Sequence, residues 1–219
     1  MPEFARLLEG YHRFRAGAWQ AQRDRYDQLA RQGQAPELMV IACSDSRVDP
    51  AQIFDVAPGE IFVVRNVAAL VPPFERTPGR HGVSAALEFA VQVLKVRQIV
   101  VMGHGRCGGC RAALAGTLAG APPGEGGFIA DWIAMLDEAR EPIAAQLGTI
   151  AATLGTSGRS AERAMEQAAV RVSLANLRSF ACVREKEATG ALVLRGTFFA
   201  ISDGVLHLLD EASDTFRPI

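Results

Sequence analysis

The amino-acid sequence predicts an α/β protein: a central, mostly parallel β-sheet flanked by helices, with an N-terminal helical arm and an antiparallel C-terminal strand. Three short apolar runs rich in valine and isoleucine are typical of strands buried on both faces: residues 37–43, 60–66 and 98–104. Between the second and third runs, residues 82–96 repeat apolar side chains at helical spacing. A strand, a helix and a strand in that order predict parallel pairing.

The length and charge of the chain limit its organisation and its partners. With 219 residues, 49% of them hydrophobic, the chain can bury one full core. Residues 3–33 carry apolar side chains among charges in a loosely helical pattern, so we expect an N-terminal helical arm over 1–33 and a single α/β domain over 34–219. The 23 basic and 24 acidic residues nearly balance, so the electrostatic footprint of nucleic-acid binding is missing.

The N-terminus predicts a cytoplasmic protein that does not enter a membrane. Glu3, Arg6 and Glu9 interrupt the apolar residues that a signal peptide would need, and no apolar stretch reaches the roughly 18 residues of a membrane span. We therefore expect a small-molecule partner. In a reducing cytosol, the four cysteines are better candidates for metal ligands, reactive thiols or core residues than for disulfides.

The second half of the chain predicts further helices and then strands. A Gly/Pro-rich break over residues 117–127 precedes two segments with helical patterns, residues 128–147 and 160–181. Residues 191–210 then contain two strand-like runs around the turn signal Asp203-Gly204.

Two cysteines and a histidine follow the ends of predicted strands. The segment CSDSRV, residues 43–48, follows one strand, and HGRC, residues 104–107, follows another. Ligands of parallel sheets gather beyond the carboxyl ends of the strands, so Cys43, His104 and Cys107 are expected to converge. Two thiolates and an imidazole are a zinc set, and three protein ligands with an open fourth position indicate a catalytic zinc. A redox pair of Cys107 and Cys110 is an alternative, although such motifs do not need the histidine.

An aspartate and an arginine stand beside the first cysteine. Residues two apart in an extended segment point to the same side, so Cys43, Asp45 and Arg47 can face one site. Asp45 can bind the fourth zinc position or accept a hydrogen bond from zinc-bound hydroxide. A bidentate guanidinium pairs strongly with a carboxylate, so Arg47 can hold Asp45 off the metal.

CSDSRV together with HGRCGG resembles the β-class carbonic anhydrases, and the neighbouring segments 58–74 and 81–104 follow the same family's pattern. The resemblance covers most of residues 34–115 and is weaker in the C-terminal half. It implies reversible hydration of carbon dioxide to bicarbonate and a proton by attack of zinc-bound hydroxide. The implied metal is one Zn²⁺ per subunit on Cys43, His104 and Cys107, and the implied catalytic dyad is Asp45 and Arg47.

The resemblance also implies a homodimer or a dimer of dimers, because the family's substrate cleft is lined in part from the neighbouring subunit. In this sequence the resemblance implies that Gln34, Phe62 and Phe89 line the substrate cleft. The aromatic residue at position 89 is commonly tyrosine in relatives, so this chain keeps the apolar wall without the hydroxyl. The substrate-binding set is completed by Val48 in the apolar pocket and by Gly108 and Gly109, which match the backbone that closes around the metal.

Two further positions indicate the subclass. One subclass of the family carries a bicarbonate site that needs a tryptophan three residues before the first cysteine ligand and a tyrosine in the late strand. This sequence has Val40 and Phe199 there, which indicates the plant-type subclass, open near neutral pH.

The remaining histidines and cysteines have no assigned role in the site. His12, His81 and His207 are available as proton shuttles, but each is expected on the surface. Cys110 and Cys182 lie in helical apolar settings and are expected in the core.

Two other functions remain open from the sequence. The same zinc site could hydrolyse carbonyl sulfide or carbon disulfide. It could also be a non-catalytic structural or sensor zinc module, with Cys110 as the fourth ligand.

Overall fold

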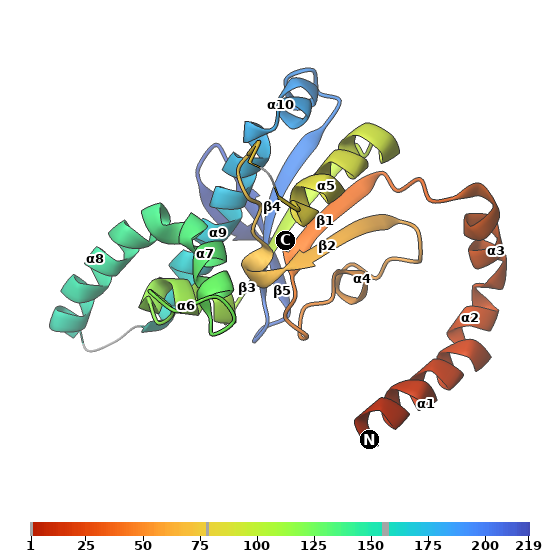
Figure 1. Cartoon of the computed structure of the whole chain (residues 1–219), viewed down its shortest axis with the longest axis horizontal. Helices are drawn as coiled ribbons and strands as arrows, with labels where there is room; N and C mark the ends of the chain where they lie inside the picture. Colours follow the sequence, from red (N-terminus) through yellow and green to blue (C-terminus); the bar gives the residue numbers. More distant parts are fainter. Residues whose placement is uncertain (1, 78, 155–157) are drawn as a thin grey trace.

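The computed structural model describes residues 2–77, 79–154 and 158–219. Within these residues, six strands form one sheet in the order β2-β1-β3-β4-β5-β6 (Figure 1). The pairs β2-β1, β1-β3 and β3-β4 are parallel, whereas β4-β5 and β5-β6 are antiparallel. The strands are β1 Leu38–Cys43, β2 Ile61–Asn66, β3 Gln98–His104, β4 Val193–Ala200, β5 Val205–Asp210 and β6 Thr215–Pro218. The predicted fold class is confirmed.

Two strands differ from the prediction. The sequence predicts that the strand over residues 60–66 is buried on both faces, which is wrong for this chain. β2 lies at an edge of the sheet, where no strand of the described chain covers its outer side, and Val63 is 37% exposed. β6 was not predicted, because the short segment TFRP lacks an apolar run.

The N-terminal segment forms three consecutive helices that extend away from the sheet (Figure 1). They are α1 Pro2–Ala16, α2 Ala18–Ala21 and α3 Arg23–Gln32. The large apolar side chains of α1 are exposed by 38–69% of their surface: Phe4, Leu7, Leu8, Tyr11 and Phe14. Within the described chain this apolar surface of the arm is therefore uncovered.

The other helices are α4 Pro50–Ile53, η1 Val67–Ala69, α5 Gly82–Glu88, η2 Phe89–Leu94, α6 Gly108–Ala115, α7 Gly127–Ile133, η3 Ala134–Leu136, α8 Asp137–Leu154, α9 Gly158–Ser179 and α10 Ala181–Ala188. The helix predicted over residues 82–96 continues from α5 into a π-helical turn, η2, and ends at the left-handed Lys95. The helix predicted over residues 160–181 ends at Phe180, whose extended backbone and buried ring separate α9 from α10. No helix among the described residues is long and apolar enough to span a membrane.

Two core clusters contain alternate residues of β1. Met39 and Ile41 belong to the cluster that includes α5 side chains, whereas Val40 and Ala42 belong to the cluster that includes α6 side chains. This alternation follows from the two-residue repeat of a strand. Since β1 and β3 are parallel neighbours in the sheet, their carboxyl ends lie side by side, and the sheet brings Cys43 close to His104.

Candidate metal centre and active site

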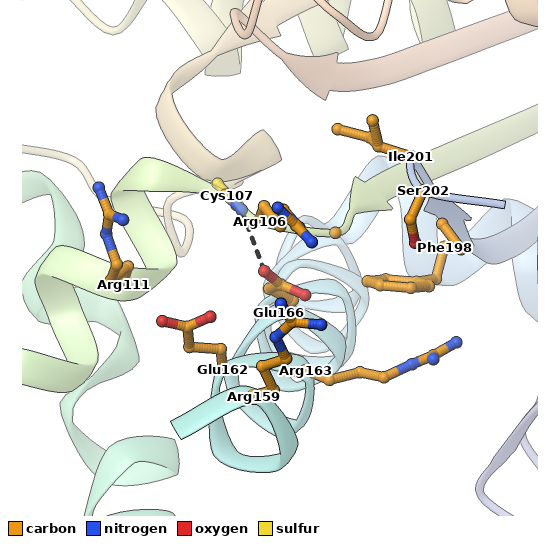
Figure 2. A pocket seen from close by; sticks show the side chains of 12 residues that line it. Arg106, Cys107, Arg111, Arg159, Glu162, Arg163, Glu166, Phe198, Ile201 and Ser202 are labelled. Carbon is orange, nitrogen blue, oxygen red and sulfur yellow. Dashed lines mark hydrogen bonds between the residues drawn. The ribbon is translucent and has the colours of Figure 1, made fainter. Parts of the chain in front are cut away.

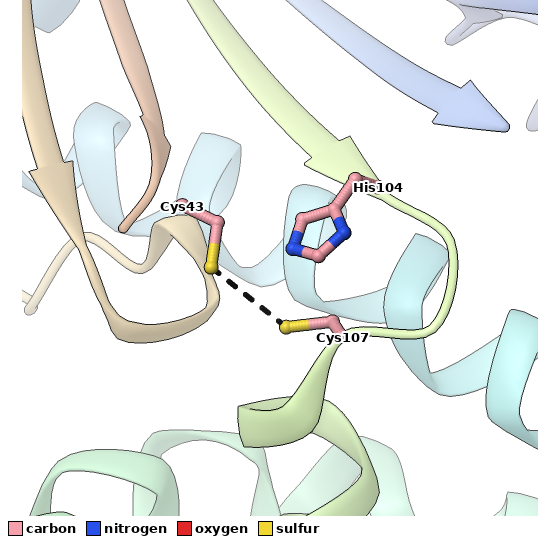
Figure 3. A group of neighbouring side chains, drawn as sticks. All are labelled: Cys43, His104 and Cys107. Carbon is pink, nitrogen blue, oxygen red and sulfur yellow. Dashed lines mark hydrogen bonds between the residues drawn. The ribbon is translucent and has the colours of Figure 1, made fainter. Parts of the chain in front are cut away.

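Three buried side chains meet where β1 and β3 end. The side chains of Cys43, His104 and Cys107 point toward one another, and one ligand atom from each lies within 4.8 Å of the other two (Figure 3). The sulfur atoms of Cys43 and Cys107 are 4.0 Å apart. The three residues are only 5%, 1% and 3% exposed. The structure thus brings together the three side chains that the sequence singles out as ligands.

The histidine ring is oriented for metal binding. Its Nδ1 lies 2.9 Å from the carbonyl oxygen of Gly105, and a carbonyl only accepts, so Nδ1 carries the proton. The other nitrogen, Nε2, is buried and has no hydrogen-bond partner among the described residues. A buried acceptor without a partner is costly, unless a ligand uses its lone pair. Two thiols and this free nitrogen fit a borderline-soft metal ion.

The two thiols resist ionisation in the metal-free protein. Hydrogen bonding with Cys107 and burial raise the pKa of Cys43 from its ordinary value of 9.0 to about 12. Hydrogen bonding with Cys110, together with burial, raises the pKa of Cys107 to about 12. Both cysteines are therefore thiols at neutral pH until a metal ion displaces their protons.

We predict that the metal-free protein loses stability in alkaline solution. Because the folded pKa values exceed the unfolded value, the stabilising contribution is full below about pH 9 and falls as the pH rises toward about 12. Urea unfolding of the metal-free protein at about pH 8 and about pH 10.5 measures the loss. A Cys43→Ala/Cys107→Ala double variant should lose less free energy of unfolding between these two pH values, and an equal loss would contradict the assignment.

Arg47 holds the carboxylate of Asp45 with three hydrogen bonds. Arg47 Nη2 donates to Asp45 Oδ2 at 2.7 Å, Nε donates to Oδ1 at 2.9 Å, and the backbone N–H of Arg47 donates to Oδ1 at 3.0 Å. These bonds hold the pKa of Asp45 well below its usual range. Asp45 Oδ2 is 4.0 Å from His104 Nε2. An ionised carboxylate thus lies beside the cluster, with both oxygens turned toward Arg47.

A second arginine, Arg65, which the sequence does not predict as part of the site, holds the backbone of the segment from Cys43 to Asp45. Arg65 Nε donates to the carbonyl oxygen of Cys43 at 2.9 Å, and Nη2 donates to that of Asp45 at 2.7 Å. Its Nη1 pairs with Asp49 Oδ2 at 3.0 Å. The sequence carries no signal for these contacts, because they depend on the register that places Arg65 beside Ala42.

A buried glutamate that the sequence does not predict as part of the site contacts the backbone of Cys107. The backbone N–H of Cys107 donates to Glu166 Oε1 on α9 at 3.0 Å, and the Glu166 side chain points toward Cys107 (Figure 2). Glu166 is 4% exposed. No motif in the sequence connects this glutamate to HGRC.

Val48, Gly108 and Gly109 lie close to the metal cluster. Val48 is fully buried and belongs to the same core cluster as Cys43 and Cys107. Gly108 and Gly109 begin α6 directly after Cys107. A Cβ atom at Gly109 would lie 2.7 Å from the Val67 side chain, so the close approach requires glycine.

Three other predicted substrate residues do not join this cluster within one chain. The rings of Phe62 and Phe89 lie 5.9 Å apart, and Phe62 packs on the core cluster that contains Met39. Gln34 is exposed between α3 and β1. The prediction that these residues serve the neighbouring subunit's cleft stays a prediction.

The remaining cysteines differ in burial. Cys110 is 2% exposed, as predicted, but it does not belong to the group of ligand atoms that Cys43, His104 and Cys107 form in the described chain. This placement argues against a structural site with four protein ligands. The prediction that Cys182 is a core residue is confirmed only in part, because this residue on α10 packs against the core cluster that contains Met39 but is only half-buried. Its position on the first turn of a short surface helix leaves one side open.

The three other histidines make contacts elsewhere. His12 is exposed, and His81 Nε2 lies 2.9 Å from the carbonyl oxygen of Thr77. His207 is half-buried rather than on the open surface, because its ring packs edge-on against Phe198 at 6.0 Å. None of the three has a hydrogen bond to the metal cluster within the described residues.

Several known proteins are similar to this chain in both sequence and fold. Residues 38–206 match the family described as carbonic anhydrase. The chain is 34% identical over 203 residues to beta carbonic anhydrase 3 of Arabidopsis thaliana, which covers 93% of this chain and 75% of that protein. The structure of the beta-carbonic anhydrase CcaA is similar with a TM-score of 0.88 and 29% identity, covering 100% of this chain and 93% of that one. A tetrameric beta-carbonic anhydrase from Sordaria macrospora has a TM-score of 0.79 and 30% identity, covering 96% of this chain and 98% of that one.

The mostly parallel sheet, with the buried Cys-His-Cys cluster at the carboxyl ends of its strands, defines the class as an α/β protein with a candidate metal centre. The chain belongs to the β-carbonic anhydrase family. This confirms the resemblance inferred from CSDSRV and HGRCGG, and with it the prediction that the chain is a carbonic anhydrase.

Proposed function

We propose that the chain uses zinc to catalyse the reversible hydration of carbon dioxide to bicarbonate and a proton. The observation that carries this proposal is the free, buried Nε2 of His104 facing two thiols. Cys43, His104 and Cys107 would hold one Zn²⁺ per subunit, and three protein ligands leave a fourth position open. Zinc bound there would supply a Lewis acid that activates water for attack on carbon dioxide near neutral pH.

Asp45 and Arg47 orient the reacting groups in this proposal. Asp45 stays ionised because Arg47 lowers its pKa, so its carboxylate accepts a hydrogen bond from the attacking oxygen and aims that oxygen at the substrate carbon. Arg47 keeps both carboxylate oxygens engaged and so prevents Asp45 from acting as a ligand. This geometry, with Val40 and Phe199 in place of the tryptophan and tyrosine, supports the plant-type, open subclass.

The substrate pocket needs a second subunit in this proposal. Val48, Gly108 and Gly109 stand at the cluster, whereas Gln34, Phe62 and Phe89 would reach it from a neighbouring copy, where Gln34 would donate to a substrate oxygen. The uncovered apolar surface of the arm supports a homodimer or a dimer of dimers, as does the tetrameric relative. All four cysteines are free thiols, which fits a cytoplasmic enzyme.

The arm offers a direct test of assembly. Changing Leu7 and Leu8 to glutamate removes apolar surface that is 69% and 46% exposed in the single chain. We expect light scattering to show a dimer or tetramer for the unchanged protein and a monomer for this variant at micromolar concentration. The control Arg13→Gln changes charge on the same helix and should keep the assembly. A monomeric unchanged protein would contradict the proposal.

Stopped-flow carbon dioxide hydration tests the proposed activity. Protein of measured zinc content is assayed from about pH 6.5 to about pH 9. We expect fast turnover at the neutral end of this pH range, and we expect it to disappear when zinc is removed. Turnover only at alkaline pH would contradict the open subclass. No turnover with zinc fully bound would overturn the activity and favour carbonyl sulfide or carbon disulfide hydrolysis, whereas unfolding on chelation would favour a structural zinc module.

A further inference from the structure

The turn that carries Cys107 has a backbone conformation that needs support. Arg106, directly before the ligand, has a φ of 57°, which lies in the left-handed region that side-chain-bearing residues rarely adopt. Such conformations persist only where the surroundings hold them. The position of the Cys107 sulfur therefore depends on what fixes residues 105–107.

Hydrogen bonds from other elements of the fold reach each of the three residues of this turn. Gly105 N–H donates to the carbonyl oxygen of Phe199 at 2.9 Å, and the carbonyl oxygen of Arg106 accepts from Arg47 Nη2 at 3.0 Å. The N–H of Cys107, the ligand itself, donates to Glu166 Oε1 at 3.0 Å. The carbonyl oxygen of Cys107 accepts from the N–H of Arg111 on the following helix α6 at 3.0 Å. The bond that Cys107 donates to Glu166 therefore ties the backbone of this residue to a different element, α9.

Glu166 is an unusual residue for its location. It is 4% exposed on α9, and no ion pair of this carboxylate exists among the described residues. Burying a carboxylate without an ion pair is costly, so an apolar residue would stabilise α9 packing better if packing were the only role. The carboxylate accepts a hydrogen bond from Cys107, which an apolar side chain could not do.

Packing beside the turn offers little support for the position of Cys107. A cavity of about 340 Å³ lies along residues 105–107 and is lined on its other side by Glu162, Arg163 and Glu166 of α9 (Figure 2). Since no side chain fills this space, packing does not replace the hydrogen bond as a support.

We propose that Glu166 is a positioning residue that fixes the Cys107 backbone and thereby the place of its sulfur in the metal centre. This inference rests on the proposed function, because it assumes that Cys107 binds the metal. The bond needs only an oxygen acceptor at the end of the side chain. Glutamine supplies that oxygen, whereas methionine of similar length does not.

Metal binding tests the proposal without relying on activity. Zinc dissociation constants are measured by chelator competition, and Co²⁺-loaded protein is examined by its sulfur-to-metal charge-transfer absorption. Glu166→Met is expected to weaken zinc binding about 10–100-fold, the usual effect of losing a group that orients a ligand, and to shift the Co²⁺ spectrum. Glu166→Gln should keep the zinc affinity and the Co²⁺ spectrum of the unchanged protein. The control Glu162→Met, one turn earlier on the same helix and beside the same cavity, should change neither.

Three results would overturn the proposal. The first is a zinc affinity and Co²⁺ spectrum in Glu166→Met that match those of the unchanged protein. The others are a loss of zinc affinity in folded Glu166→Gln, or in Glu162→Met, as large as the loss in Glu166→Met. If Glu166→Met does not fold, Glu166→Asp keeps the carboxyl group and shortens the reach, and it should weaken zinc binding while Glu166→Gln does not. An unchanged protein that binds no zinc would instead contradict the proposed function. The two failures are thus distinguishable.

Discussion

Changing Cys107 to serine is expected to remove bound zinc and carbon dioxide hydration together. The substitution leaves the buried turn and its bond to Glu166 in place but replaces a thiolate ligand with a hydroxyl that does not ionise near neutral pH. Only Cys43 and His104 remain as protein ligands. The loss in metal affinity should exceed the roughly 10–100-fold typical of groups that merely orient a ligand.

Metal analysis after dialysis against a chelator, followed by stopped-flow hydration, measures both effects. Cys182→Ser is the matched control, because this half-buried thiol lies outside the metal cluster and should leave zinc content and turnover unchanged. A Cys107→Ser protein that retains one zinc per chain in this site would contradict the ligand assignment.

Changing Asp45 to asparagine is expected to leave zinc bound and to lower turnover about 10²–10⁴-fold, the range for losing a positioned acid–base group. The amide is neutral, and the nitrogen that replaces one carboxylate oxygen cannot accept the hydrogen bond that Arg47 gives at that position. The attacking oxygen would then lose the anionic acceptor that orients it. Because the pKa of Asp45 is lowered, wild-type activity should show no titration of this group at neutral pH.

Turnover of zinc-loaded Asp45→Asn protein at saturating carbon dioxide is the measurement. Asp49→Asn is a suitable control: Asp49 pairs with Arg65 and caps α4, and asparagine preserves a good cap. Near-normal turnover in Asp45→Asn would remove Asp45 from the mechanism. A comparable loss in Asp49→Asn would show that the effect comes from the segment's structure.

Local patterns were sufficient to predict the sheet's parallel centre and the metal cluster. The apolar runs that form β1 and β3 end in Cys43 and His104, the candidate ligands, and neighbouring parallel strands place such ends together. Asp45 and Arg47 were also predictable as a pair, although they meet across a turn that the hydrogen bond from Val48 N–H to the Asp45 carbonyl closes, and not in the extended segment that the sequence predicts.

The supporting residues were not predictable, because their contacts come from packing and register. Glu166 meets Cys107 only because α9 packs beside α6, and Arg65 meets Cys43 only through the β1-β2 register. The helix end at Phe180 carries no glycine or proline signal. Exposure of β2 depends on strand order in the sheet, which hydrophobicity alone does not determine.

The adjacency of β1 and β3 has a consequence for the order of events in folding. β2 and α5 lie between these strands in the chain, so their pairing closes a long loop, which is a slow, non-local step. The complete ligand set cannot exist before that step. A metal ion held by all three side chains would therefore bind the native state more tightly than the unfolded chain and would stabilise the native state by mass action.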